Sequence, residues 1–141
     1  MVHSIRERPL PVPTSDSRPF WKACQAGQLM LQRCAQCARL RFYPRALCPY
    51  CYSHEASWQP VAGKGFVYAA TVVHRPPSPA FAADVPYVVA IIELDEGPRM
   101  MSNVVGCTPE SVVVGMLVEV VFDVVSPEIT LPRFRPTTAS S

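Results

Sequence analysis

Four cysteines in two pairs form the arrangement with the clearest chemistry in this sequence. Each pair is a Cys-x-x-Cys and ten residues separate the pairs, which are Cys34 with Cys37 and Cys48 with Cys51. A Cys-x-x-Cys turn presents two thiolates on one side of a tight knuckle, and two knuckles supply four ligands in tetrahedral geometry. Zinc prefers such soft sulfur donors, and four thiolates leave no open position for a substrate. The spacing therefore predicts one structural Zn²⁺.

The second pair also allows a redox interpretation. Cys48-Pro49-Tyr50-Cys51 matches the redox tetrapeptide of glutaredoxins. That chemistry needs the first cysteine at a helix N-terminus that follows a strand, where the dipole lowers the thiol pKa. Here Pro44 lies just upstream, no helical periodicity follows, and the other pair lies at zinc-ribbon distance. These features favour zinc.

Other cysteines and arginines accompany the two pairs. Cys24 and Cys107 stand apart from both pairs, and buried free thiols that act as small hydrophobes are the expectation for them. Four arginines surround the pairs and would offset the negative charge of a four-thiolate zinc: Arg33, Arg39, Arg41 and Arg45.

A short helix is expected before the cysteine pairs. Residues 15–17 offer capping side chains, and Phe20, Trp21 and Cys24 recur at helical spacing before Gly27 ends the segment. Two aromatic side chains on so short a helix need a surface to cover them. That surface is either a partner protein, with Phe20 and Trp21 as docking anchors, or this chain's own ribbon.

From about Pro60 the pattern changes to β-structure. Alternating apolar residues predict five strands, at 66–74, 87–94, 99–105, 116–125 and 129–134. The inward-facing residues of the second strand are expected to be Val88, Ala90, Ile92 and Leu94, and those of the fourth Val118, Val120, Phe122 and Val124. The fold class is therefore mainly β, with an N-terminal helix and a rubredoxin-like zinc ribbon followed by a five-stranded OB-fold barrel.

This pattern divides the chain into four segments. Residues 1–14 form a proline-rich flexible tail, 15–58 the helix and zinc ribbon, 59–135 the OB-fold domain, and 136–141 a disordered tail.

Composition narrows the classes of function. A net charge of only +2 over 141 residues is weak support for a polyanionic partner, and no apolar stretch is long enough to predict a membrane span. The first residues lack the apolar core of a secretory signal, so a cytoplasmic, reducing location is expected. No phosphate-binding loop, Gly-x-Ser-x-Gly or pair of catalytic carboxylates is found, and we expect no catalytic residues.

Several of these residues together resemble a known family. The run Gly27-x-Leu29, Arg33-Cys34-x2-Cys37, Tyr43-Pro44-Arg45, Cys48-Pro49-x-Cys51 resembles the zinc-ribbon signature of the DUF35 family. The segments 86–90, 93–97 and 102–103 are similar to the barrel of that family. The sequence departs at Ala38, where many members carry glycine after the second cysteine.

The resemblance implies a non-catalytic accessory subunit of a thiolase-superfamily enzyme: a thiolase, an acyltransferase or a steroid side-chain aldolase. A hotdog-fold enoyl-CoA hydratase is an alternative partner. The helix and ribbon of such proteins dock on the enzyme, and the barrel helps to bind or channel the acyl-CoA thioester.

Candidate CoA-binding residues are the basic side chains near the expected barrel mouth, Lys64, Arg75 and Arg99. The competing hypothesis is a single-stranded nucleic-acid-binding module, because zinc ribbons and OB barrels also serve that function. It is disfavoured because the second strand ends in acidic residues, Glu93, Asp95 and Glu96.

Overall fold

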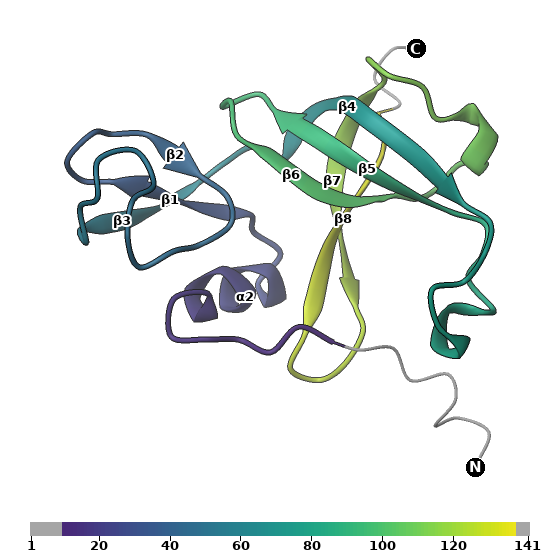
Figure 1. Cartoon of the computed structure of the whole chain (residues 1–141), viewed down its shortest axis with the longest axis horizontal. Coiled ribbons are helices and arrows are strands. Elements are labelled where there is room, and N and C mark those ends of the chain that lie inside the picture. The colour runs from purple at the N-terminus through teal and green to yellow at the C-terminus, as the bar shows by residue number, and fades with distance from the viewer. Residues whose placement is uncertain (1–9, 138–141) are drawn as a thin grey trace.

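The computed structural model describes residues 10–137 (Figure 1). Helix α2 (Arg18–Gln25) precedes a three-stranded antiparallel sheet of order β2-β1-β3. Its strands are β1 (Met30–Cys34), β2 (Leu40–Arg41) and β3 (Ala56–Pro60). Most of the two predicted tails lies outside the described residues, and residues 10–14 have no helix or strand. Within residues 10–137, no helix is long and apolar enough to cross a bilayer.

The second half of the chain is a closed five-stranded barrel. Its strands are β4 (Lys64–Val73), β5 (Tyr87–Leu94), β6 (Arg99–Val104), β7 (Leu117–Val124) and β8 (Thr130–Pro136), in the closed order β4-β5-β6-β8-β7. One parallel pairing, Val104 with Phe134, joins β6 to β8. Two single 3₁₀ turns, η1 (Pro79–Phe81) and η2 (Pro109–Ser111), lie in the connections. The predicted architecture of helix, zinc ribbon and five-stranded OB-fold barrel is confirmed.

The apolar alternation of the strands forms the barrel core. All four inward-facing residues predicted on β5 are buried. On β7, however, Val124 was expected to face inward and is 71 % exposed, so that expectation is wrong. Val124 pairs with Thr130 at the hairpin end of β7, where the two strands run beyond the barrel core (Figure 1).

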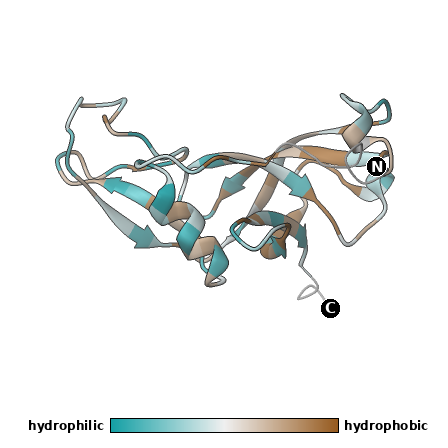
Figure 2. Ribbon diagram, turned by 90° about the horizontal axis from the view of Figure 1, so that it is seen from below, coloured by the Kyte–Doolittle hydropathy of each residue, from teal (hydrophilic) through white to brown (hydrophobic). Residues whose placement is uncertain are grey.

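The ribbon strands are less hydrophobic than the barrel strands. Figure 2 shows the hydrophobic colour concentrated in the barrel strands, whereas the ribbon strands are mostly pale or hydrophilic. Strand β3 pairs with β1 from Ala56 to Pro60, so the ribbon sheet extends two residues beyond residue 58. A sheet this small buries too little apolar surface to be stable alone, so the ribbon needs a metal or a packing partner.

Helix α2 provides that packing. It begins after Ser17, whose hydroxyl oxygen accepts a hydrogen bond from the Thr14 amide (2.9 Å). It ends at Gln25, and Gly27, with a φ of 76°, turns the chain away from the helix axis. Phe20 and Trp21 are buried, with exposed fractions of 1 % and 7 %, and the Phe20 ring contacts those of Trp21 and Phe42 at centroid distances of 4.9 and 5.5 Å.

The helix also contacts the barrel. It packs against β1 on one side and β7 and β8 on the other, and the side-chain amide of Gln25 donates to the carbonyl of Glu128. Of the two possible roles of Phe20 and Trp21, their burial favours packing within this chain over direct contact with a partner.

Replacing Phe20 by alanine should lower the free energy of unfolding by about 4 kcal/mol, because a fully buried ring leaves a cavity among its neighbours. Urea unfolding followed by tryptophan fluorescence measures the change. Lys22→Ala is the matched control, since Lys22 is exposed on the same helix, and it should alter stability by less than about 0.5 kcal/mol. A loss below about 1 kcal/mol for Phe20→Ala would contradict its place in the core.

Candidate metal centre and arginine-lined cleft

The four paired cysteines converge at the end of the ribbon. The Sγ atoms of Cys34 and Cys51 lie 3.4 Å apart, those of Cys37 and Cys48 lie 3.7 Å apart, and all four lie within 4.8 Å of one another. A tetrahedral zinc with Zn–S bonds of about 2.3 Å would separate its sulfur ligands by about 3.8 Å. The donor set and its spacing therefore fit one structural Zn²⁺ held by these four residues.

The two knuckles have the same local geometry. The amides of Ala38 and Tyr52 each donate to the carbonyl of the first cysteine in their knuckle, at 2.9 Å. Both residues adopt a left-handed backbone conformation, with φ of 65° and 64°. This conformation costs a residue with a Cβ roughly 1 kcal/mol. This backbone conformation favours glycine, which is the residue that many DUF35 members carry at the position of Ala38.

Backbone amides stabilise two of the thiolates. The amide of Cys37, followed by that of Gln36, donates to the Cys34 sulfur at 3.4 Å and lowers the pKa of Cys34 to about 6. Burial opposes ionisation of Cys48, but the amides of Tyr50 and Cys51 outweigh it and lower the pKa. Although the Ser53 amide acts in the same direction on Cys51, the adjoining Cys34 sulfur and burial raise the pKa of Cys51 to about 12. A bound cation would displace the proton of Cys51 and hold its sulfur as a thiolate.

The structure does not favour the redox interpretation. Cys48 directly precedes a turn at residues 49–51, and neither a helix nor a strand adjoins the Cys48–Cys51 segment. Cys24 is fully buried, and burial raises the pKa of its thiol to about 12, so it stays neutral and inert. Cys107 is half-buried and packs against the core.

The three basic residues predicted to bind CoA do not form one cluster. Lys64 begins β4, and its carbonyl accepts from the Asp95 amide in the β5–β6 turn; Arg99 begins β6 on the other side of that turn. Arg75 follows the opposite end of β4, beyond the pairing of Val73 with Tyr87. The length of β4 thus separates Arg75 from the other two.

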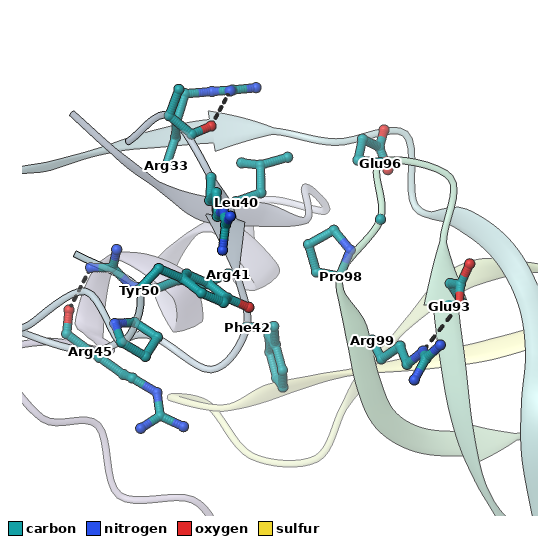
Figure 3. A pocket seen from close by; sticks show the side chains of 14 residues that line it. Arg33, Leu40, Arg41, Phe42, Arg45, Tyr50, Glu93, Glu96, Pro98 and Arg99 are labelled. Carbon is teal, nitrogen blue, oxygen red and sulfur yellow. Dashed lines mark hydrogen bonds and ion pairs between the residues drawn. The ribbon is translucent and has the colours of Figure 1, made fainter. Parts of the chain in front are cut away.

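Arg99 lines a cleft of about 930 Å³ between ribbon and barrel (Figure 3). Its Nε donates to Glu93 Oε1 at 3.0 Å, which raises the pKa of Arg99, and its guanidinium lies 3.7 Å from the centroid of the Tyr68 ring. The ribbon wall carries four more arginines and an exposed tyrosine, namely Arg33, Arg39, Arg41, Arg45 and Tyr50.

Sequence reasoning did not predict this cleft, because it assigned the ribbon arginines only to charge compensation at the metal. One signal was present in the sequence. No acidic residue occurs between Asp16 and Glu55, whereas all four ribbon arginines of the cleft fall in that interval.

Replacing Cys48 by serine should release the metal and unfold the ribbon, since metal binding and ribbon folding are coupled. Wild type and the control Cys107→Ser should each carry about one zinc per chain by elemental analysis, and Cys48→Ser should carry almost none. Zinc-free wild-type protein with a Cys48–Cys51 disulfide would contradict the metal site and support redox chemistry.

Two family models match the chain in chain order. They are the rubredoxin-like zinc ribbon domain of ChsH2, over residues 21–55, and its C-terminal OB-fold domain, over residues 58–123. A probable enoyl-CoA hydratase alpha subunit of Thermomonospora curvata is 43 % identical over 129 residues, which are 92 % of this chain and 40 % of that protein. The chain thus spans less than half the length of that relative.

Other relatives match over most of their own length. A DUF35 domain-containing scaffold protein of Methanothermobacter thermautotrophicus is 38 % identical over 70 % of this chain and 74 % of its own. The solved structure of an Ltp2-ChsH2(DUF35) aldolase contains a chain with 42 % identity and a TM-score of 0.81, covering 90 % of this chain and 98 % of that one. The ribbon, the barrel and these relatives together show that the chain belongs to the DUF35 family.

Proposed function

We propose that this chain is a non-catalytic accessory subunit of a thiolase-superfamily enzyme that forms or cleaves a carbon–carbon bond in an acyl-CoA thioester. The observation that carries the proposal is the match to the Ltp2-ChsH2(DUF35) aldolase, in which the aligned chain is covered almost completely. The partner would be a thiolase, an acyltransferase or a steroid side-chain aldolase. The chain would dock on it and help to bind or channel the thioester.

The chemistry of the described residues supports an accessory role. A zinc ion with four thiolate ligands has no open position for a substrate. Cys24 is buried with a raised pKa, and no hydrogen bond joins Cys24 or Cys107 to a histidine within residues 10–137. A thiol nucleophile needs such a base or a lowered pKa. The reactive groups would therefore belong to the partner.

The proposed docking surface is the pair of exposed apolar side chains that flank the second knuckle, Leu47 and Tyr52. Tyr52 is 71 % exposed and follows Cys51 directly, so the metal centre holds its backbone in place. Exposed aromatic side chains on rigid elements make strong interface contacts, because little conformational entropy is lost on binding. Phe20 and Trp21 would act indirectly, by holding the ribbon in position.

A hotdog-fold enoyl-CoA hydratase is the second candidate partner. The name of the Thermomonospora curvata relative supports it, although this chain corresponds to only 40 % of that protein. Nucleic acid is less favoured, because the barrel segment 59–135 has eight acidic and five basic residues and would repel a polyanion.

The double variant Leu47→Asn, Tyr52→Asn tests docking. Asparagine tolerates the left-handed conformation of residue 52 and removes the apolar contact. We expect the Kd for a thiolase-superfamily enzyme that co-purifies with this chain to rise about 30-fold, equivalent to about 2 kcal/mol, in biolayer interferometry.

Val113→Asn, Val114→Asn is the matched control, because both valines are exposed on the barrel side of the molecule. It should leave the Kd unchanged. Equal affinity for all three proteins would refute the docking surface. Binding to a hotdog-fold hydratase and to no thiolase-like enzyme would transfer the proposal to the second candidate.

A further inference from the structure

The cleft between ribbon and barrel concentrates positive charge that the fold does not neutralise. Five arginines and two glutamates line it. Glu93 pairs with Arg99, and Glu96 accepts a hydrogen bond from the Ala62 amide at 3.0 Å. The four ribbon arginines have no carboxylate within ion-pair distance in the described part of the chain. The ribbon wall is therefore an uncompensated basic surface.

Two of these arginines are free to bind a ligand. Arg39 and Arg45 are exposed, and within residues 10–137 their guanidinium groups make no hydrogen bond or ion pair. The Arg39 guanidinium lies 4.5 Å from the centroid of the Tyr50 ring, which is itself exposed in the cleft. Arg33, in contrast, already donates to Gln59 Oε1 and to the Ala38 carbonyl, each at 2.7 Å.

Arg41 adds a buried charge to the same wall. It is only 4 % exposed, its Nε donates to Gln32 Oε1 and its Nη2 to the Arg45 carbonyl, both at 2.9 Å. Its Nη1 has no partner among the described residues. Buried charges are normally paired, because removing them from water is costly. A bound anion would supply the missing counter-charge.

The metal centre does not account for all of this charge. Zn²⁺ with four thiolates carries two negative charges, whereas the ribbon contributes four arginines to the cleft. The whole segment 15–58 has six basic and two acidic residues. An excess of positive charge thus remains on the ribbon after the metal is counted.

The side chains of the cleft identify the class of ligand. Guanidinium groups match phosphate oxygens in fork geometry, and an aromatic ring with an arginine beside it offers a stacking face for a planar base. The volume is at the upper end of the range for small-molecule sites. We infer that the cleft binds the phosphorylated adenosine end of coenzyme A, with Arg39 and Arg45 on the phosphates and Tyr50 against the adenine. This inference rests on the proposed function, since it takes a CoA thioester to be the ligand.

Isothermal titration of the full zinc-loaded chain without any partner enzyme tests the inference. CoA and adenosine 3′,5′-bisphosphate should bind with Kd values within tenfold of each other, and the affinity should fall as NaCl rises. Pantetheine, which lacks the nucleotide, should not bind. No binding of CoA to the wild-type chain, equal binding of pantetheine, or equal binding of inorganic pyrophosphate would overturn it.

The variant Arg39→Gln, Arg45→Gln should bind CoA at least tenfold more weakly while keeping its zinc. Arg18→Gln, Lys22→Gln removes the same charge from the exposed side of α2 and should bind as wild type does. A decrease smaller than tenfold in the first variant, or an equal decrease in the second, would overturn the inference. Tighter binding of a 12-nucleotide single-stranded DNA than of CoA would overturn it in favour of nucleic acid. Because no enzyme is present, failure here would leave the docking result untouched.

Discussion

The packing of the apolar face of α2 between two small domains is the interaction on which the rest of the structure depends. Phe20 and Trp21 fill the space between ribbon and helix, and Gln25 on the same helix donates a hydrogen bond to the β7–β8 hairpin. The metal site shapes the ribbon internally, whereas α2 contacts both the ribbon and the barrel and so helps to fix where the ribbon lies. One wall of the cleft comes from the ribbon and the other from the barrel (Figure 3). The cleft therefore depends on the fixed position of the ribbon relative to the barrel.

Charge is divided between the same two bodies. Basic residues outnumber acidic ones in the ribbon segment 15–58, and the reverse holds in the barrel segment 59–135, so the modest net charge of +2 conceals a strong asymmetry. No ion pair joins the two walls of the cleft among the described residues, and Arg99 with Glu93 contributes one charge of each sign to the barrel wall. An anionic ligand placed near the ribbon wall would meet uncompensated guanidinium groups, whereas an extended polyanion lying across the barrel would be repelled.

The sequence predicts those parts of the fold that local pattern controls. The spacing of the four cysteines indicates the metal site, and the alternation on β5 indicates the inner face of the barrel. Strand β3 was not predicted, because Ala56, Ser57 and Gln59 have little intrinsic preference for strand and form one only by pairing with β1. Periodicity also cannot tell whether Phe20 and Trp21 cover a partner or their own domain. The cleft could not be predicted either, because Arg99 and the ribbon arginines line one cleft only when the two domains are packed together.

Reconstitution with a partner enzyme tests most directly whether catalysis by this chain depends on that partner. The rate of carbon–carbon bond cleavage in an acyl-CoA substrate is measured for this chain alone, for a thiolase-superfamily enzyme that co-purifies with it, and for an equimolar mixture. We expect no turnover by the chain alone and at least a tenfold higher rate, or recovery of soluble enzyme, in the mixture. Turnover by the isolated chain, or an enzyme whose rate and solubility do not change when the chain is added, would contradict the accessory role.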